Sequence, residues 1–474
     1  MDELTKHRRY VVLAICCSSL FLVSIDNTIV NVALPSIRTD LNASVAGLQW
    51  IIDAYTLVLA ALLMLGGSSA DRFGRKRFFM IGTATFVLGS LLCSVAPSLG
   101  WLVAFRTLQA VGGSMMNPVA MSIITNTFTD PKERAGAIGV WGGVVGISMA
   151  GGPLIGGALV TSAGWQSIFW VNVPIGLVAL FMTWKFVPES KAAHARRFDP
   201  VGQVLMIVLL ASLVFTIIET PAEGWSSTVI LASASIAVLS LLGFLYVESR
   251  QKEPLVELGF FRSVPFSGAT VIAVCAFASL GGFLFLNTLY LQDVRGFSPL
   301  HAGLYTLPMA LMTLVFAPIS GRITGSRGPR FSLVVAGVGL TVSSIMLTQL
   351  GPDTSFRWLA LSYIVFGIGF GMVNAPITNT AVSGMPRSQA GVASAIASTS
   401  RQVGQSLGVA VVGSIVTAGL VGSFEDGFVD AARPAWFVML AAGVTVLVLA
   451  VLTTGHWARG TAQRVADRAP ELVS

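Results

Sequence analysis

Residues 67–77 read Gly-Ser-Ser-Ala-Asp-Arg-Phe-Gly-Arg-Lys-Arg and connect two long apolar runs, at 48–70 and 78–96. Each run is long enough to cross about 30 Å of hydrocarbon as a helix. The same test identifies further runs at 10–34, 99–123, 135–161, 168–187, 201–218, 229–247, 264–291, 302–319, 331–350, 358–382, 403–421 and 435–455. The sequence therefore predicts an all-α polytopic membrane protein with fourteen spans.

The distribution of positive charge tests this threading independently. Lys and Arg near span ends concentrate on the cytoplasmic side of a membrane. With the N-terminus inside, the inner segments hold 24 of the 29 Lys and Arg residues. We therefore expect a multi-pass protein of the plasma membrane with both termini in the cytoplasm.

Composition excludes several other classes of protein. Hydrophobic residues make up 54% of the chain and charged residues 11%, whereas soluble domains carry about 25% charged residues. The net charge of +7 is spread over short inner segments, which argues against nucleic-acid binding. The four cysteines lie within apolar runs, and neither a disulfide framework nor a zinc site is predicted. We expect no enzyme, because the sequence offers no nucleophile and base set, metal cluster or phosphate loop.

An internal repeat divides the chain. Residues 67–76 align with 321–330, which matches Gly67 with Gly321 and Gly74 with Gly328, and Pro131, Ala135 and Gly136 recur as Pro386, Ala390 and Gly391. These matches predict a parallel duplication of six spans, with two spans inserted between the halves. The expected parts are 1–190, 191–255 and 256–474, with a substrate site between the two six-helix bundles near the bilayer midplane.

The first run carries the leading candidate for proton coupling. Asp26 lies among Ser24, Asn27 and Asn31 in an otherwise apolar helix. A carboxylate at that depth costs about 2.5–3.5 kcal/mol to insert, so such acids usually face a cavity or a partner and often relay protons. The alternative is a neutral or paired Asp26 that only holds neighbouring helices together.

Arg106, inside the fourth run, is the sole strongly basic residue away from the ends of any predicted span. It forms a stripe with Gln109, Gly113 and Asn117 at helical spacing. A guanidinium near Asp26 would favour the ionised carboxylate, and arrival of substrate could shift that balance. The alternative is an arginine that only bonds backbone carbonyls between helices.

Other candidates are less sharply defined. Asp53, near the outer end of the second run, is a further candidate for proton coupling or, equally, an interfacial acid. Aromatic faces suit lipophilic cations, although most Phe residues pack or face lipid. The expected lining of the substrate cavity is Asn27, Asn31, Gln109, Asn117, Phe283, Asn287, Phe370 and Asn374.

The fifth run is unusually rich in glycine. Small residues four apart, as at Gly142 and Gly146 or at Gly152 and Gly156, allow helix backbones to approach closely. Pro153 removes a backbone donor and can bend the helix. Gly404 and Gly408 repeat the spacing in the thirteenth run. Packing alone explains both sets, and a hinge is compatible with it.

These segments resemble the fourteen-span drug/proton antiporters of the major facilitator superfamily, along nearly the whole chain. The resemblance rests on residues 25–35 in the first span, the loop 67–77, residues 106–109, Gly152-Pro-Leu-Ile-Gly-Gly157, and residues 165–174. Ala110 and the pair Gln166-Ser167 depart from the usual pattern.

The resemblance implies proton-driven export of small amphipathic compounds by alternating access. It places Asp26 and Arg106 in the coupling region and gives the fifth span, with Gly152, Pro153, Gly156 and Gly157, the role of an antiporter helix. No cofactor is implied beyond the proton gradient, and we expect a functional monomer in the bilayer.

The loop motif is expected to form a cytoplasmic gate from Gly67, Asp71, Arg72, Gly74 and Arg75. Asp71 would meet the positive N-terminal end of the thirteenth span near Ser398 to Arg401. The remaining alternatives are an exporter or importer of a single metabolite or lipid, and a receptor that transports nothing.

Overall fold

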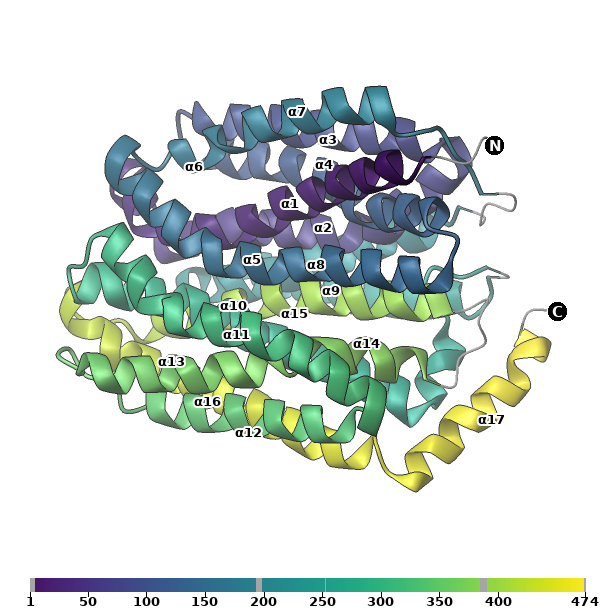
Figure 1. Ribbon diagram of the computed structural model, residues 1–474. Helices are drawn as coiled ribbons and strands as arrows, with labels where there is room; N and C mark the ends of the chain where they lie inside the picture. Colours follow the sequence, from purple (N-terminus) through teal and green to yellow (C-terminus); the bar gives the residue numbers. More distant parts are fainter. Residues whose placement is uncertain (1–4, 193–197, 252, 384–389, 473–474) are drawn as a thin grey trace. The chain divides into compact units, whose positions relative to one another are not determined.

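In the computed structural model, residues 5–192, 198–251, 253–383 and 390–472 are described, and most of them are helical (Figure 1). Thirteen of the described helices or joined helices are long and apolar enough to cross a membrane. α4, at Leu99–Thr127, is not among the thirteen although it has 29 residues. Arg106, Gln109 and Asn117 lie in this helix and lower its hydropathy.

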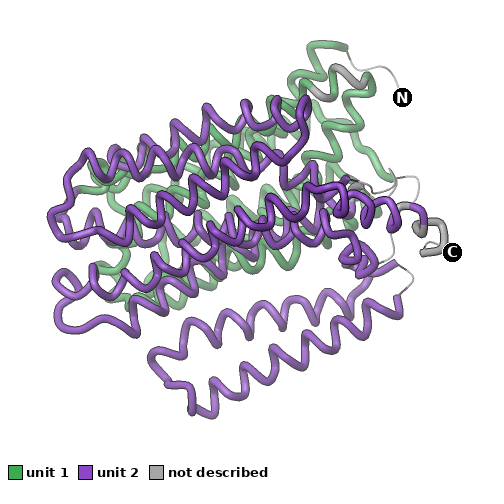
Figure 2. Tube along the Cα trace, turned by 90° about the horizontal axis from the view of Figure 1, so that it is seen from below, with its two compact units in different colours: residues 1–198, 298–303 green, residues 199–297, 304–474 purple. Residues whose placement is uncertain are grey.

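The chain divides into two compact units (Figure 2). Unit 1 contains Met1–Phe198 and Ser298–Gly303, and unit 2 contains Asp199–Phe297 and Leu304–Ser474. The two inserted helices, expected as a separate part, group with unit 2. They do so because α8 packs against α15, where the Ser414 hydroxyl donates to the Ile217 carbonyl at 2.6 Å.

Unit 1 is built from seven helices that follow the first six predicted spans. They are α1 (Lys6–Asp40), α2 (Val45–Phe73), α3 (Arg75–Ser94), α4 (Leu99–Thr127), α5 (Pro131–Ala163), α6 (Ser167–Trp170) and α7 (Asn172–Phe186). Glycine allows the closest contacts. A Cβ on Gly112 of α4 would lie 2.3 Å from the Phe86 nitrogen of α3, so only glycine fits there.

Unit 2 holds the inserted pair and the second set of spans. Its helices are α8 (Pro200–Glu223), α9 (Thr228–Glu248), α10 (Val264–Leu289), α11 (Pro299–Arg327), α12 (Arg330–Leu347), α13 (Phe356–Gly371), α14 (Asn374–Val382), α15 (Ala390–Gly419), α16 (Phe424–Leu452) and α17 (His456–Leu472). The short helices η1 (Leu258–Arg262) and η2 (Tyr290–Val294) flank α10. α10 and α15 pack closely at Gly404 and Gly408, whose Cβ positions would lie 2.4 Å and 2.2 Å from backbone oxygens of α10.

Several helix boundaries differ from the predicted ones. α15 begins at Ala390 and not near Val403, because residues 391–402 are small and only weakly apolar yet continue the helix. The expected sixth and twelfth spans are each interrupted, at Val171 and at Met372 to Val373. The tail expected to be short contains the helix α17.

The glycines matched by the repeat occupy equivalent places in the backbone. Gly74 lies between α2 and α3 with φ +119°, and Gly328 lies between α11 and α12 with φ +82°. Both values are in the region that L side chains rarely adopt. Of the other matches, Pro386 lies outside the described residues.

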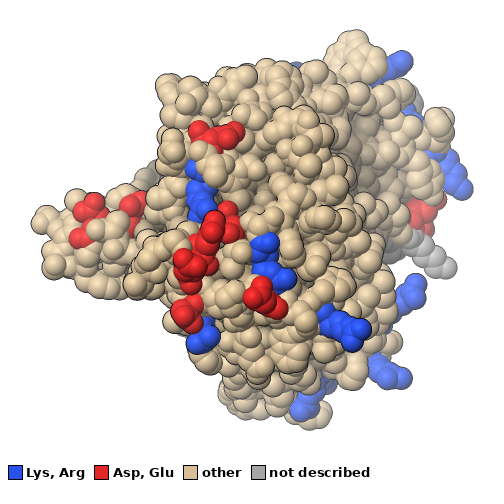
Figure 3. Space-filling view, turned by 90° about the vertical axis from the view of Figure 1, so that its left-hand side faces the viewer, with Lys and Arg blue, Asp and Glu red and all other residues tan. Residues whose placement is uncertain are grey.

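Charge is sparse on the surface. On the face seen in Figure 3, acidic and basic side chains occupy small areas between uncharged residues. Large apolar side chains are instead exposed along the helices, among them Leu239 of α9 at 67% and Trp184 of α7 at 63%. Exposed apolar area of this extent is typical of a surface that contacts lipid.

Candidate functional site

Asp26 of α1 and Arg106 of α4 form a buried ion pair inside unit 1. Arg106 donates from Nη1 to Asp26 Oδ2. The Asp26 side chain is 0% exposed and the Arg106 side chain is 1% exposed. Two charges removed from water in this way are stable only when their remaining polar atoms are also satisfied. The neighbouring residues provide those bonds.

Three further groups bond to the pair. Gln109, one turn after Arg106, donates to Asp26 Oδ1 at 2.9 Å and accepts from Arg106 Nη1 at 2.8 Å. Asn172, the first residue of α7, donates to Asp26 Oδ1 at 3.0 Å. Arg106 Nε donates to the Ile51 carbonyl of α2 at 3.3 Å. Asp26 of α1 thus accepts hydrogen bonds from α4 and α7, and Arg106 of α4 also donates to α2.

Aromatic rings cover the guanidinium. Its Cζ atom lies 4.0 Å from the centroid of the Tyr55 ring and 5.8 Å from that of Phe169. Tyr55 is fully buried, and its hydroxyl has no hydrogen-bond partner among the described residues. A low local dielectric strengthens the attraction within the pair and also raises the cost of leaving either charge alone.

Asp53, the other candidate acid, lies on α2. It is 0% exposed. The Thr56 hydroxyl donates to its Oδ1 at 3.5 Å. None of the contacts of Asp26 or Arg106 described above involves Asp53.

The expected cavity residues fall into two sets, one in each unit. In unit 1, Asn31 donates to the Asn27 carbonyl at 3.0 Å, and Asn117 is half-buried with an Oδ1 that has no partner in the described chain. Gln109 belongs to the Asp26 network. Only Asn27 and Asn117 of this set are appreciably accessible.

In unit 2, most of the expected residues are packed together. Asn287 accepts from the Tyr363 hydroxyl at 2.6 Å, and Phe283 stacks on Phe366 with centroids 4.1 Å apart. Phe370 is 4% exposed, whereas Asn374 is exposed. Asn287, Phe283 and Phe370 therefore belong to the core of unit 2 in this structure.

Sequence reasoning missed two polar residues. Asn172 was quoted only as part of a signature, although an amide inside an apolar run was a usable signal. Arg401 precedes the predicted thirteenth span at 403–421, but it lies eleven residues past the start of α15. The statement that Arg106 is the sole strongly basic residue inside a span is therefore wrong. The late predicted start of the thirteenth span caused this error.

The expected gate residues surround the turn between α2 and α3. Asp71 accepts from Arg75 Nε at 2.8 Å, and Arg72 Cζ lies 5.7 Å from the Phe73 centroid. Glu189, which sequence reasoning did not single out, accepts from the backbone nitrogens of Lys76 and Arg77 at the start of α3. Ser398 to Arg401 do not form the N-terminal end of α15, which is at Ala390.

α1 and α5 are close at one end and apart at the other. A Cβ on Gly152 would lie 2.0 Å from Thr28 Oγ1, and one on Gly156 would lie 2.6 Å from Ile29 Cγ1. A Cβ on Gly142 would meet no atom within 4 Å, so the prediction of close approach at Gly142 is wrong.

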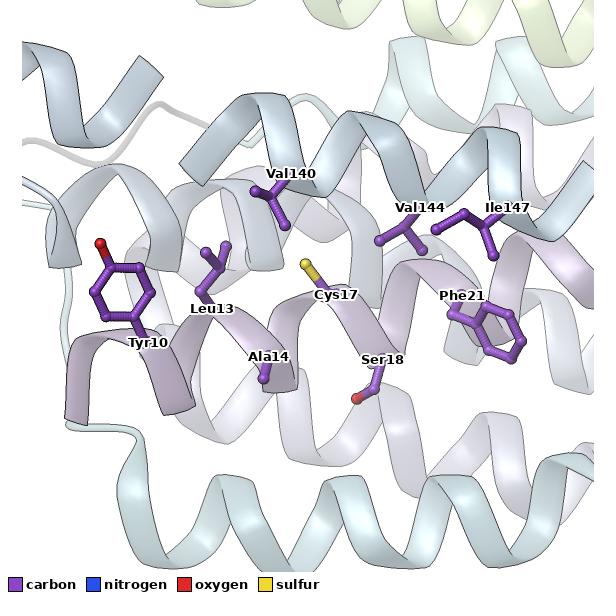
Figure 4. Close-up of a pocket in the computed structure, with 9 residues that line it drawn as sticks. All are labelled: Tyr10, Leu13, Ala14, Cys17, Ser18, Phe21, Val140, Val144 and Ile147. Atoms are coloured by element: carbon purple, nitrogen blue, oxygen red, sulfur yellow. The ribbon is translucent and has the colours of Figure 1, made fainter. Parts of the chain in front are cut away.

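At that open end, an apolar cavity of about 530 Å³ separates the two helices. Figure 4 shows its walls, formed by α1 side chains from Tyr10 to Phe21 and by Val140, Val144 and Ile147 of α5. The α1–α5 wedge, as we name this arrangement of residues 10–29 and 140–156, narrows toward Thr28, next to Asp26 along the chain.

Comparison with known proteins agrees with this geometry. Residues 16–409 match the family described as the Major Facilitator Superfamily. The chain is 40% identical to a tetracenomycin C resistance and export protein of Streptomyces glaucescens, over 88% of this chain and 77% of that protein. It is 35% identical to the multidrug efflux pump LfrA of Mycolicibacterium smegmatis, over 87% and 82%.

A solved structure shares the fold. It is a bacterial homologue of the human lysosomal transporter Spinster in an inward-facing and unoccupied conformation, with a TM-score of 0.68, 20% identity, and coverage of 98% of this chain and 99% of that one. These matches and the apolar helices are those of a multi-pass membrane transporter. The chain belongs to the Major Facilitator Superfamily.

Proposed function

We propose that this protein exports amphipathic or hydrophobic drugs or antibiotics in exchange for protons, by alternating access. The buried pair of Asp26 and Arg106 carries the proposal. A carboxylate inside the membrane is costly and is usually retained for function, most often in an ion or proton pathway. The resistance and export proteins named above support a drug or antibiotic as substrate.

The proposed coupling uses the charge of Asp26. When Asp26 is ionised, it accepts from Arg106, Gln109 and Asn172. A proton on Asp26 removes the attraction to Arg106, so the helices α1, α4 and α7 that meet there are held less tightly. A substrate that disturbs this network would change proton affinity, and proton binding would change substrate affinity by the same factor.

The proposal includes fourteen spans, with α4 as one of them, and cytoplasmic termini. It includes a functional monomer and no cofactor other than the proton gradient. Asp71 and its neighbours form the proposed cytoplasmic gate, in which the bond from Arg75 to Asp71 is one arrangement of the turn. Gly152, Pro153, Gly156 and Gly157 of α5 form the proposed antiporter helix.

The test reconstitutes wild type, Asp26→Asn and Asp353→Asn in vesicles that contain a pH dye. Asp353 is an exposed acid between α12 and α13 and serves as the matched control. After a proton gradient is imposed, lipophilic cations, organic acids and neutral antibiotics are added in turn. We expect proton movement triggered by substrate in wild type and Asp353→Asn, and none in Asp26→Asn.

Two results would contradict parts of the proposal. Equal proton movement in all three proteins would remove Asp26 from the coupling and redirect attention to Asp53. If no compound of the panel triggers proton movement in wild type, the result would argue for transport of a single metabolite or lipid, or for a receptor that transports nothing.

A further inference from the structure

Arg401 is a second arginine well inside a spanning helix, and its surroundings differ from those of Arg106. It lies about 16 Å along α15 from Ala390 at the usual rise per residue. In the part of the chain that the structure describes, no carboxylate forms an ion pair with Arg401. A cation with a buried, unpartnered Nε and no counter-ion is costly, and such a residue in a membrane protein often marks a functional site.

Neutral groups hold the guanidinium in place. Nη1 donates to Ser398 Oγ at 3.3 Å, and Nη2 donates to Thr378 Oγ1 and, at 3.5 Å, to the Asn374 carbonyl. These partners fix the orientation of the side chain but neutralise no charge. They come from α15 itself and from α14, so the position of Arg401 is defined within unit 2.

One edge of the guanidinium has hydrogen-bonding capacity left. The Nε atom is buried and has no hydrogen-bond partner in the protein as described. Nearly all buried polar atoms have a partner, so a buried charged donor without one needs an explanation. The Nε–H of an arginine can donate a charge-assisted hydrogen bond to a carboxylate, whereas Nη2 on the same edge already donates to Thr378 and Asn374.

An aromatic surface continues from the arginine. The Cζ atom of Arg401 lies 6.0 Å from the centroid of Phe277 on α10. Phe277 meets Phe370 edge to face with centroids 5.2 Å apart. Phe370 is buried, but Phe277, Arg401 and Thr378 are half-buried and Asn374 is exposed. A ligand that reaches Arg401 would therefore also contact an aromatic ring.

From this juxtaposition we infer that Arg401 and Phe277 form a subsite of unit 2 for an organic anion that carries an aromatic ring. The carboxylate, or an equivalent acidic group, binds the Nε edge of Arg401, and the ring packs on Phe277. The inference rests on the proposed export function and narrows it, because a cationic subsite selects acidic aromatic substrates and disfavours the lipophilic cations that the aromatic residues alone suggested.

The first experiment measures binding, so that it does not depend on transport. Wild type, Arg401→Gln, Arg401→Lys and Arg459→Gln are placed in phosphatidylcholine nanodiscs at pH 7. Arg459 is exposed on α17 and is the matched control for loss of one positive charge. The probes share one ring system: 2-naphthoate, its methyl ester, and a naphthylmethyl trimethylammonium ion. Size-exclusion profiles and unfolding midpoints check that each variant is folded.

We expect Arg401→Gln to weaken binding of 2-naphthoate by about tenfold or more, since a hydrogen bond to a charged group contributes more than a neutral one. Binding of the methyl ester should stay within a factor of about two, the ordinary range of a surface change. Arg401→Lys should recover part of the loss, and Arg459→Gln should resemble wild type. Selectivity for naphthoate over the cation should fall in Arg401→Gln.

Three results would overturn the inference: no measurable binding of naphthoate by wild type, an equal loss for all three probes in Arg401→Gln, or equal losses in Arg401→Gln and Arg459→Gln. Nanodiscs that contain anionic phosphatidylglycerol test whether the anion bound at this subsite is a lipid headgroup. If that lipid displaces naphthoate from wild type, the subsite binds a lipid headgroup and the inferred substrate is wrong.

The two proposals fail differently. Repeating the vesicle assay with naphthoate tests transport. Binding that depends on Arg401 without any proton movement would contradict proton-driven export and leave the subsite standing. Proton movement with other substrates, without binding that depends on Arg401, would contradict the subsite and leave proton-driven export standing.

Discussion

At the scale of single residues, burial of Asp26 and Arg106 costs hydration free energy, while their mutual attraction and hydrogen bonds stabilise the folded protein. Each charge is buried at a considerable cost in hydration, and each is satisfied mainly by the other and by Gln109. Breaking such a pair by removing one partner is strongly destabilising, whereas replacing both partners is much less so. The stability of unit 1 should therefore depend on whether the two charges are both present or both absent.

A double-mutant cycle tests this dependence. We expect Arg106→Gln alone to destabilise the protein by about 3–5 kcal/mol, the range for a buried charge left unpaired. Asp26→Asn alone should also destabilise, because it leaves the Arg106 charge uncompensated. The double variant should be more stable than the sum of the single changes predicts. Unfolding midpoints of the purified proteins, followed by tryptophan fluorescence, provide the measurement.

An exposed pair provides the control for this cycle. Arg433 and Asp430 on α16 lie 3.3 Å apart, with side chains 50% and 81% exposed. Their coupling should be about 0–1 kcal/mol, because solvent screens exposed charges. If the buried pair shows no larger coupling than this exposed pair, the importance assigned to the contact between Asp26 and Arg106 is wrong.

The sequence identified some residues of the site better than others. Asp26, Arg106 and Gln109 are polar groups in long apolar runs, and the bilayer makes such residues conspicuous. Their contact across two helices could not be predicted, since helix spacing says nothing about which helices meet. Asn172 was overlooked because an uncharged amide stands out less, and because the break that begins α7 is not visible in a hydropathy profile.

At the scale of elements, the α1–α5 wedge shows how glycine placement determines a helix pair. Gly152 and Gly156 allow contact near Thr28 and Ile29, while Gly142 has open space around it. The same small-residue spacing thus has two structural outcomes in one helix. The spacing permits close approach, but a partner surface must also be present.

Alanine substitutions along α5 test this difference. Gly152→Ala should destabilise by about 1–3 kcal/mol, the usual cost of overpacking, because its Cβ would lie 2.0 Å from Thr28 Oγ1. Gly142→Ala should be neutral or stabilise by about 0.5–1 kcal/mol, since alanine is the better helix former. Unfolding midpoints and transport rates are measured for both. Equal effects at the two positions would show that the wedge is not the arrangement in the membrane.

Hydropathy located the helices well and their ends less well. The apolar centres of the predicted spans all lie within described helices or joined helices. The start of α15 was placed too late, and the helix α17 was not expected. Both errors have the same origin, since helix formation follows backbone hydrogen bonding and continues through weakly apolar or polar residues that a hydropathy window excludes.

At the scale of the whole molecule, the number of crossings decides where the tail lies. Fourteen crossings place α17 on the same side of the membrane as the N-terminus, and thirteen would place it on the opposite side. Hydropathy alone leaves α4 below the threshold for a span. Charge distribution favours fourteen, because any missing span inverts every loop that follows it.

Single cysteines report this topology. In a variant whose four native cysteines are replaced by serine, we expect Gly460→Cys on α17 to react with an impermeant maleimide only in inverted vesicles. Val421→Cys, between α15 and α16 at a side chain 82% exposed, should react only in intact cells. For each cysteine, the extent of reaction with the impermeant maleimide is measured as the loss of labelling by a fluorescent maleimide that is added afterwards. Reaction of both positions from the same side would contradict the proposed fourteen spans.

The predicted duplication is supported more by the loops than by the spans. Gly74 and Gly328 both have a positive φ in the turns that the repeat aligns, and a backbone of that kind favours glycine at both positions. Within the spans, many apolar sequences satisfy the same lipid contact, so the similarity between the halves is weak there. The sequence alone could not assign the inserted helices to unit 2, because that grouping depends on packing against α15.

Under the proposed proton coupling, the buried pair would also link transport to membrane voltage. Asp26 and Arg106 together carry no net charge when both are ionised, and a proton on Asp26 leaves one positive charge. A single charge that crosses the whole membrane field gains or loses about 2.3 kcal/mol per 100 mV. If the protonated pair changes its position in that field during the cycle, the membrane potential will drive transport together with the pH difference across the membrane. Export could then continue when the pH is equal on the two sides of the membrane.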